Sequence, residues 1–223
     1  MMEWYLCRFH SLLFKHYAKW TKFREKERIE MEKELSELSL EELWRLFPII
    51  LKESQPHYKN WYEAEKYEIF QNIDREDIIR INHIGSSAVE GVLSKPTIDI
   101  LLEIDGRCDV NQIINKLGGI GYGVMSQEKA PMKWVLNKGY TPSGYADKVF
   151  HLHLGYHGDW NELYFRDYLQ KHSDIAQEYS NLKMSLMNDY EHNRDGYTEA
   201  KSDFVLKYTQ IAKQEYRGRY KPK

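Results

Sequence analysis

The sequence predicts an α+β fold in which a small mixed β-sheet has flanking helices and is followed by a helical C-terminal half. Three observations predict this class. Apolar residues at helical spacing come first, strand-like alternation occupies the middle of the chain, and helical spacing returns for nearly all of the chain after Gly158. Strands and helices that are segregated along a chain are typical of a sheet with its helices gathered on one side.

Two helices are expected before the first strand. Ser39 and Glu42 have the spacing of a capping box, and the apolar residues that follow end at Pro48, where a helix stops or kinks. Pro56 opens the second helix. The side chains predicted to face the sheet from this helix are Trp61, Tyr62, Ala64, Tyr67 and Phe70. The glutamates expected to be solvated are Glu63, Glu65 and Glu68.

The clearest strands are predicted at residues 78–84 and 97–104. The second alternates, with isoleucine and leucine on a core-facing side and Asp99, Leu101 and Glu103 on the side expected to point away from the core. Two further strands are expected around the glycines that follow a short helix. The other predicted elements are that helix at 110–117, a strand at 150–154, and helices at 160–171, 173–193 and 198–216.

Composition limits the class of protein. With 223 residues, 42% of them apolar and 14% aromatic, the chain is long enough for one well-buried domain with a helical extension. A net charge of −2 argues against a nucleic-acid partner. Cys7 and Cys108 predict neither a disulfide framework nor a thiolate metal site, and no apolar run approaches the roughly 18 residues of a transmembrane segment. We therefore expect a cytoplasmic protein.

Three parts are predicted along the chain: an extension at 1–30, a globular domain at 31–217 and a basic tail at 218–223 that frays. In residues 1–28, seven basic and three acidic side chains give a net charge of +4. With its aromatic residues, this extension is expected to form either a helix that contacts an anionic surface or an ordinary docking helix. A third hypothesis is that translation starts at Met31, because the codons for the preceding Lys-Glu-Arg run can form a ribosome-binding site.

A Gly-Ser loop between the first two strands predicts a phosphate and metal site. Gly85 permits close backbone approach, while Ser86 and Ser87 offer amides and hydroxyls to phosphate oxygens. Lys95 adds a positive charge, and Asp99 is the best candidate for a metal ligand, because it follows the loop on a strand whose other face is apolar. The alternative is that Gly85 only turns the chain and Asp99 is a solvated strand residue.

These residues resemble the signature of the GrpB family, a His-Ile/Val-Gly-Ser-Thr-Ala-Val-Pro-Gly run followed by Lys-Pro-Ile-Ile-Asp-Ile. Here the runs are residues 83–91 and 95–100, with Ser87 in place of threonine and Glu90, a negative charge beside the loop, in place of proline. Further matching residues, in order, are 150–154, 165–169, Tyr179, Leu182, Lys183, Tyr197, Lys201 and Phe204. The resemblance covers roughly residues 38–212, which makes chance similarity a poor explanation.

The resemblance implies a sheet of nucleotidyltransferase type. It implies no particular reaction. With the loop residues, it leads us to expect a protein that binds a nucleotide or another phosphorylated small molecule with a divalent metal, magnesium or manganese, with zinc as an alternative. If the protein is an enzyme, we expect it to transfer a phosphorus-containing group. Arg166 lies in a matching segment and either binds a phosphate of the substrate or pairs with Asp167 to brace its helix. Lys183 and Lys201 could face the cleft, although lysines on helices are usually solvated.

The second carboxylate of such a site is the difficulty. Active members of the superfamily carry acids at i and i+2 of this strand, but the residue two after Asp99 is Leu101, and Glu103 lies about 13 Å from Asp99 along an extended strand. His151 and His153 are the predicted replacements, since alternation puts both on one strand face. The predicted metal ligands are Asp99, His151 and His153. The predicted catalytic residues are Asp99 and His153, the latter as ligand or general base.

Alternatives to this function stay open. The histidines could instead donate hydrogen bonds to phosphate or carboxylates. Leu101 favours a non-catalytic binding module, and His151 with His153 could centre a metal-dependent hydrolase. A histidine-triad hydrolase is disfavoured because Gly155 stands where the third histidine belongs. The glycines of 118–123 are not expected to form a dinucleotide loop, since they follow a helix rather than a strand.

Overall fold

The computed structural model describes residues 35–129 and 132–222. The described residues belong to two compact units, with the boundary after Leu43. The predicted extension at 1–30 and the hypothesis of a start at Met31 lie outside the described residues. Among the helices of the described part, none is long and apolar enough to cross a membrane.

The predicted capping box is confirmed at the beginning of α2 (Leu40–Leu46), which follows the short helix η1 (Leu35–Glu37). The backbone N–H of Glu42 donates to Ser39 Oγ at 3.2 Å, and the backbone N–H of Ser39 donates to Glu42 Oε2 at 2.8 Å. Two N–H groups that have no partner within the helix are thereby satisfied.

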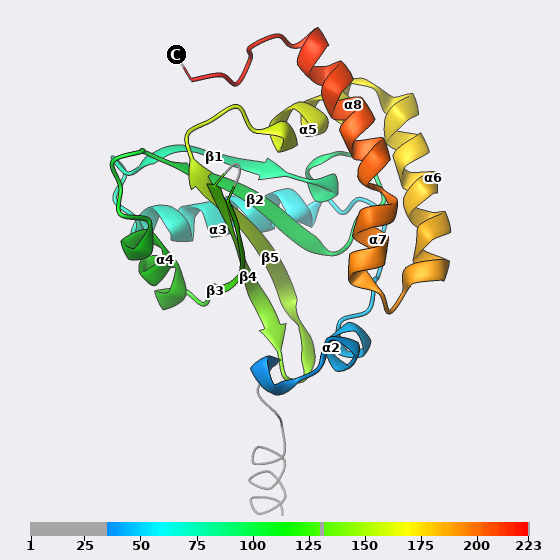
Figure 1. Cartoon of the computed structure of the whole chain (residues 1–223), viewed down its shortest axis with the longest axis horizontal. Helices are drawn as coiled ribbons and strands as arrows, with labels where there is room; N and C mark the ends of the chain where they lie inside the picture. The colour runs from blue at the N-terminus through cyan, green and yellow to red at the C-terminus, as the bar shows by residue number, and fades with distance from the viewer. Residues whose placement is uncertain (1–34, 130–131, 223) are drawn as a thin grey trace, which may run out of the picture. The chain divides into compact units, whose positions relative to one another are not determined.

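The second unit is built on a five-stranded mixed sheet with strand order β1-β2-β5-β4-β3 (Figure 1). Its strands are β1 (Ile78–Ile84), β2 (Thr97–Ile104), β3 (Gly123–Lys129), β4 (Met132–Thr141) and β5 (Gly144–Tyr156). β2 and β5 run parallel, and the other neighbours are antiparallel. The α+β class, the mixed sheet and the bounds of β1 and β2 are confirmed. β5 begins at Gly144 rather than at Phe150, because it extends into a hairpin with β4.

A bulge in that hairpin precedes Tyr140. The register of β4 on β5 shifts between Lys138 and Tyr140, and Gly139 at the shift has φ +93°. A Cβ atom at this position would lie 2.2 Å from the carbonyl oxygen of Lys148, so the bulge requires glycine.

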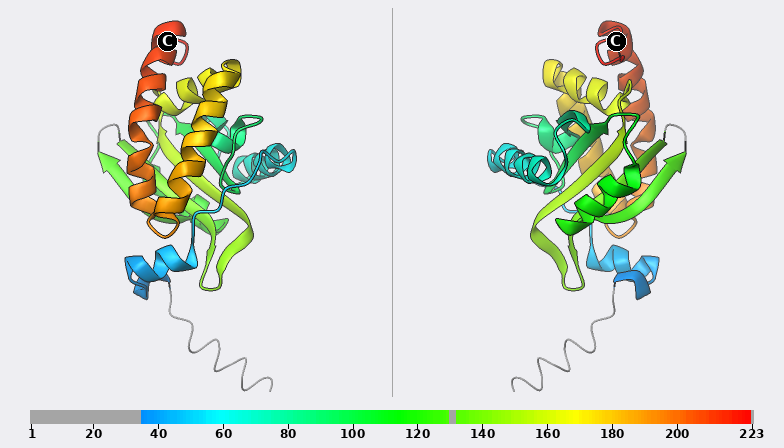
Figure 2. Two further views of the ribbon diagram at one scale, coloured as in Figure 1. Left: turned by 90° about the vertical axis from the view of Figure 1, so that its right-hand side faces the viewer. Right: turned by 90° about the vertical axis from the view of Figure 1, so that its left-hand side faces the viewer.

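Helices cover both faces of the sheet, which corrects the expectation that they gather on one side. The helices of this unit are α3 (His57–Asn72), α4 (Val110–Gly119), α5 (Asn161–Lys171), α6 (Ser173–Tyr190), α7 (Arg194–Ala200) and α8 (Ser202–Glu215). α3 and α4 share an apolar cluster with Ile98 and its neighbours on one face, while Leu101 on the other face packs with Trp160 and Leu163 at the beginning of α5. Figure 2 shows α4 and the C-terminal helices on opposite sides of the strands.

The buried face of α3 agrees in part with the predicted one, since Tyr62 is buried and Trp61 and Phe70 pack against the core cluster. Tyr58, Tyr62, Glu65 and Ile69 are buried, whereas Tyr67 is 65% exposed. Lys138 Nζ on β4 donates to Glu65 Oε1 at 2.9 Å, which explains why a carboxylate expected to be solvated lies inside. Aromatic residues occupy several sides of this helix, so apolar spacing alone neither excluded Tyr67 nor found Glu65.

The last predicted helix, residues 198–216, corresponds to the end of α7 and to α8, which are separated at Lys201. Asn193 caps α7, since its side-chain oxygen accepts a hydrogen bond from the N–H of Gly196 at 2.9 Å. The chain therefore turns between α6 and α7, and the new helix starts with Arg194.

Candidate functional site

The Gly-Ser loop packs directly on the Asp99 carboxylate. Gly85 follows β1 with φ 69° and ψ −171°, a conformation that is essentially confined to glycine, and Ser86–Ala88 then form the short helix η2. A Cβ atom on Gly85 would lie 2.3 Å from Asp99 Oδ2. Glycine at this position thus brings the loop and the carboxylate together.

His151 on β5 is the nearest partner of Asp99. The two residues are paired across the parallel strands, and His151 Nδ1 lies 3.4 Å from Asp99 Oδ1. Burial alone would raise the pKa of Asp99, but the hydrogen bond from His151 and the positive charge of Lys201 oppose it, and the net effect lowers the pKa. Burial also lowers the pKa of His151. Asp99 is therefore an anion at neutral pH and His151 is uncharged.

The other nitrogen of His151 faces Arg194 and Tyr140. Arg194 Nη2 donates to His151 Nε2 at 3.1 Å, and Tyr140 Oη lies 2.7 Å from the same atom. Because arginine only donates, Nε2 is the acceptor and the proton belongs on Nδ1, toward Asp99. The guanidinium carbon also lies 5.6 Å from the centre of the Tyr140 ring.

Two lysines share one tyrosine ring beside Asp99. Lys95 Nζ lies 5.3 Å and Lys201 Nζ 4.8 Å from the centre of the Tyr197 ring. Burial lowers the pKa of Lys95 to about 7, and the positive charges of Arg194 and Lys201 add to the effect. Burial likewise lowers the pKa of Lys201. Burial therefore destabilises the protonated form of both lysines, and a bound anion would stabilise that form.

Lys183 of α6 reaches the loop from the other side. Only 2% of this residue is exposed, and its Nζ donates to Ser86 Oγ at 2.9 Å and to the carbonyl oxygen of Leu93. The Nζ lies 4.3 Å from the centre of the Tyr179 ring. Burial lowers the pKa of Lys183 to about 7, and the charge of Lys201 contributes. The expectation that lysines on these helices are solvated is wrong here.

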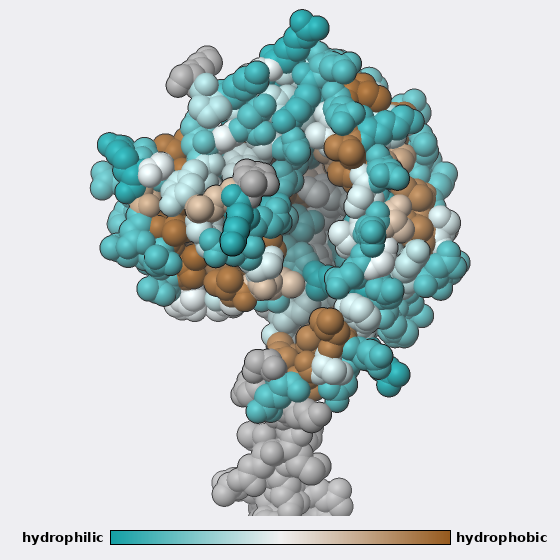
Figure 3. Space-filling view, viewed as in Figure 1, coloured by the Kyte–Doolittle hydropathy of each residue, from teal (hydrophilic) through white to brown (hydrophobic). Residues whose placement is uncertain are grey.

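We call Lys95, Lys183, Arg194 and Lys201 the cation cluster. Each of the four lies over a tyrosine ring, and within the described part of the chain none makes an ion pair with a carboxylate. One member precedes β2 and the others come from α6 to α8. Figure 3 shows a hollow between the strands and these helices. The site therefore has an excess of positive charge around the single carboxylate of Asp99.

His153 lies on the same strand as His151, opposite Leu101. Its Nδ1 is buried without a hydrogen-bond partner among the described residues and lies 3.9 Å from Glu162 Oε1. Burial lowers the pKa of His153, and the negative charges of Asp99 and Glu162 oppose the shift. His153 is thus an uncharged imidazole that could accept a proton.

The donors as they are placed do not fit a divalent metal. His151 has Asp99 at one nitrogen and Arg194 with Tyr140 at the other. Within residues 35–129 and 132–222, no group of three or more histidine, cysteine, aspartate or glutamate side chains could hold a metal ion. Ligation by Asp99, His151 and His153 stays a prediction.

The residues that follow Asp99 on its strand face have structural roles. Leu101 is fully buried with Trp160 and Leu163. Glu103 is also fully buried, where Arg80 Nη2 donates to Glu103 Oε1 at 2.7 Å. This face was expected to point away from the core, but helix α5 covers it, so neither residue supplies a second acid to the site.

Ser87 lies on the far side of the loop, in a separate cleft. Its Oγ is 3.1 Å from His83 Nε2, and the His83 ring stacks on Tyr62 with centroids 4.9 Å apart. Burial lowers the pKa of His83 to about 4. The cleft has a volume of about 1240 Å³, and Ser87, His83 and Arg166 are among its lining residues. Of the predicted binding residues, Gly85, Ser86 and Lys95 therefore lie beside Asp99, whereas Ser87 and Arg166 line the separate cleft.

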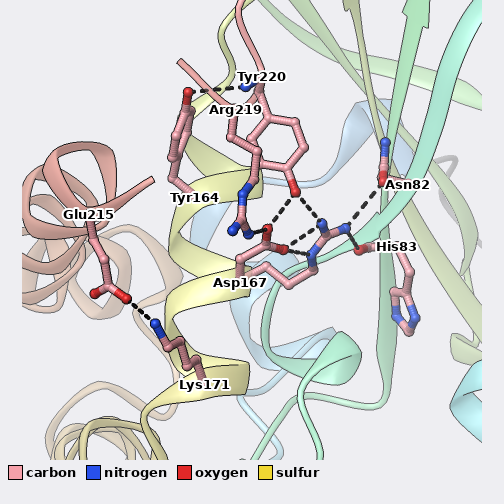
Figure 4. Close-up of polar contacts among 9 residues, drawn as sticks. Asn82, His83, Tyr164, Asp167, Lys171, Glu215, Arg219 and Tyr220 are labelled. Atoms are coloured by element: carbon pink, nitrogen blue, oxygen red, sulfur yellow. Dashed lines mark hydrogen bonds and ion pairs between the residues drawn. The ribbon is translucent and has the colours of Figure 1, made fainter. Parts of the chain in front are cut away.

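Arg166 braces the helix α5 against β1, one of the two roles predicted for it. Its Nη1 donates to the carbonyl oxygen of His83 at 2.9 Å, and its Nη2 donates to Asp167 Oδ1 at 2.7 Å. In Figure 4, Arg219 and Tyr220 reach the same Asp167 carboxylate, at 2.9 and 2.5 Å. The tail expected to fray is thus held by this network. Contact between Arg166 and a substrate stays a prediction.

Sequence patterns missed Arg194 and Tyr140. Arg194 is separated from His151 by 43 residues and Tyr140 by 11, and no local motif marks either contact. Only the family signature drew attention to Lys183 and Lys201. The hairpin register and the break between α7 and α8 bring these side chains to the site, and neither feature is encoded by apolar spacing.

Comparisons with known proteins agree with the resemblance. The model of the family described as "GrpB protein" matches residues 48–211. A "Glutamate-rich protein GrpB" of Alkalihalophilus pseudofirmus is 34% identical over 161 residues, which cover 70% of this chain and 91% of that protein. The chain spans about half the length (52%) of two other curated relatives.

Among solved structures, the crystal structure of the conserved protein GrpB from Enterococcus faecalis matches with a TM-score of 0.66 and 27% identity. It covers 75% of this chain and 99% of that one. The Cid1 poly(U) polymerase matches with a TM-score of 0.38 and 15% identity, covering 61% of this chain and 43% of that one.

Proposed function

The chain belongs to the GrpB family, and from that premise we propose that the site around Asp99 binds a nucleotide or another phosphorylated small molecule with its phosphates among the cation cluster. The observation that carries the proposal is the absence of ion pairs to these four cations among the described residues. Lys183 is buried and the other three are partly buried. Charges withdrawn from water are normally paired, because leaving water costs free energy that a counter-charge recovers. A phosphate group supplies that counter-charge through charge-assisted hydrogen bonds.

The loop supports the same ligand. Gly85 holds the backbone close to Asp99, and Ser86 presents its hydroxyl beside the ammonium group of Lys183. Backbone amides in a tight turn, a serine hydroxyl and lysines are the groups that cradle phosphate oxygens in many proteins. The predicted binding roles of Gly85, Ser86 and Lys95 are thus combined with three cations from the helices.

For catalysis we propose nucleotidyl transfer to an acceptor hydroxyl. The acceptor oxygen would attack the α-phosphorus of a nucleoside triphosphate, the bond to the β-phosphate would break and pyrophosphate would leave. The cation cluster would stabilise the charge on these phosphates, and His153 would take the proton of the acceptor. Asp99 would keep the proton of His151 on Nδ1, so that Nε2 accepts from Arg194 and fixes the guanidinium group. The divalent metal predicted from the family resemblance is not needed for these roles.

A non-catalytic binding module is the second candidate. Leu101 favours it, because this residue is fully buried against Trp160 and Leu163 where a second acid would be needed for metal-assisted transfer. Such a module would use the same cation cluster to bind its ligand. Release of pyrophosphate from a nucleoside triphosphate in the presence of acceptors would favour the transferase.

Binding can be tested directly by calorimetry and thermal unfolding with ATP and ADP. At a ligand concentration of 100 times the dissociation constant, binding should add about 2.7 kcal/mol to the free energy of unfolding. Arg194→Met or Lys201→Met should weaken binding about 10-fold or more, since a hydrogen bond to a charged group contributes roughly 1.5–3 kcal/mol.

Lys207→Met is the matched control. Lys207 also lies over a tyrosine ring, with its Nζ 4.7 Å from the centre of the Tyr208 ring, but it is outside the cation cluster. Its replacement should leave the affinity for nucleotide unchanged. Equal affinities for wild type, Arg194→Met and Lys201→Met would contradict the proposed site.

The affinity should also fall as pH rises from 7 to 9. Lys95 and Lys183 have pKa values of about 7, so they lose their charge over this range in the free protein, while bound phosphates favour the protonated forms. The loss should approach roughly tenfold per pH unit for each proton taken up on binding. Phosphate monoesters, with a second pKa of about 6, are already doubly charged.

Calorimetry in two buffers of different ionisation enthalpy would measure this proton uptake. Arg194 keeps its charge throughout, and deprotonation of Lys201 would act in the same direction. Proton release, or an affinity that is constant from pH 7 to 9, would show that these lysines do not contact the ligand.

A further inference from the structure

The charge balance of the site points to a particular way of holding phosphates. When all groups are ionised, the four members of the cation cluster and the carboxylate of Asp99 give a net charge of +3. Glu103, the next carboxylate on the strand, is paired with Arg80 and is not available to the site. Proteins that bind nucleotide phosphates usually neutralise them with magnesium held by carboxylates. Here side chains already supply that positive charge.

The same side chains oppose a metal ion at Asp99. A divalent cation at this carboxylate would add two positive charges next to the cation cluster, with one carboxylate to offset them. A metal at His151 Nε2 would have to displace both Arg194 and Tyr140, which lie 3.1 and 2.7 Å from it. Anions, by contrast, are attracted to all four cations.

Resting on the proposed function, we infer that the site binds the phosphate chain directly, with protein cations in place of a divalent metal, and that it selects ligands with three or four negative charges. A terminal phosphate carries about −2 at neutral pH, and each further phosphate of a chain adds about one charge. Because bound phosphates favour the protonated forms of Lys95 and Lys183, the occupied site approaches a net charge of +3, which a nucleoside di- or triphosphate matches better than a monophosphate does.

This mode of binding gives Asp99 the opposite role from a metal ligand. Its carboxylate orients His151, and through it Arg194, but its own charge repels the phosphates. Asp99→Asn should therefore tighten nucleotide binding in the absence of metal. In a site that holds phosphates through a metal on Asp99, the same substitution would weaken binding, so the sign of the change distinguishes the two.

The test is isothermal titration calorimetry of the full chain with AMP, ADP and ATP, once in EDTA and once in excess magnesium chloride. In EDTA, we expect ATP to bind at least tenfold tighter than AMP, with ADP in between. Magnesium should weaken ATP binding severalfold, because it neutralises part of the ligand. Asp99→Asn should bind ATP in EDTA severalfold tighter than wild type.

Asp105→Asn is the control for the substitution, since Asp105 is an aspartate paired with exposed Arg107 outside the site. ATP binding by wild type that needs magnesium would overturn the inference while leaving the proposed function in place, and this comparison does not depend on the variant folding. Loss of ATP binding in folded Asp99→Asn would do the same. Failure of AMP, ADP and ATP to bind in either solution would overturn the proposed function as well.

Discussion

Replacement of Arg80 by methionine is expected to lower the free energy of unfolding by about 3–5 kcal/mol. Arg80 donates through Nε and Nη2 to both carboxylate oxygens of Glu103, and also to the carbonyl oxygen of Gly158 at 2.9 Å. Glu103 is fully buried, so removal of the guanidinium leaves a carboxylate with neither water nor a cation beside it. Urea denaturation followed by circular dichroism measures the loss.

Two further variants make this result specific. Arg107→Met removes an arginine of the same kind that is 89% exposed beside Asp105, and it should change stability little. The double variant Arg80→Met with Glu103→Leu should regain most of the loss, because an apolar pair of similar volume often replaces a buried ion pair at little cost. A loss below about 1 kcal/mol in the single variant would contradict the structural role of the pair.

Gly85→Ala should damage stability and ligand binding together. The backbone conformation of Gly85 costs other residues roughly 1–3 kcal/mol, and the new Cβ would lie 2.3 Å from Asp99 Oδ2. Rotation of the carboxylate would not remove this overlap, since Asp99 Cβ and Cγ would each lie 3.0 Å from the new Cβ. The loop must move, which displaces Ser86 from Lys183, and nucleotide affinity should fall at least tenfold.

Gly91→Ala is the control that introduces backbone strain without a new contact to Asp99. Gly91 also has a positive φ of 76°, but nothing lies within 4 Å of a Cβ placed there. Its alanine variant should lose stability from backbone strain alone and keep its affinity for nucleotide. Equal affinities in the two variants, measured by calorimetry below their unfolding temperatures, would mean that the loop does not contribute to the site.

Local patterns were sufficient for much of the fold. Alternation over Thr97–Ile104 predicted β2 with its bounds, and the spacing of Ser39 and Glu42 predicted a capping box that is present. These features depend on residues close in sequence. The solvation expected for Glu65 on α3 was wrong, because this residue is buried through a partner on β4, Lys138, which lies 73 residues away. A long-range ion pair of this kind leaves no periodic signal.

The residues of the candidate site also differ in whether local sequence could predict them. The Gly85 loop and Asp99 were predicted because glycine, serine, lysine and aspartate follow one another within one strand–loop–strand segment. Arg194 could not be predicted, since its contact with His151 depends on how α7 packs against the sheet. Asp99 was also expected on an open face, whereas residues at the beginning of α5 cover that face at Leu101, two positions after it.

The origin of the cation cluster has a consequence for how such proteins diversify. The strands supply Asp99 and the histidines, while Lys183, Arg194 and Lys201 come from α6 to α8. Substitutions in the helices alone can therefore alter the charge and shape offered to a ligand, without disturbing the strand pairing on which folding depends. A lineage can change its ligand through the last third of its gene and inherit the remainder unaltered.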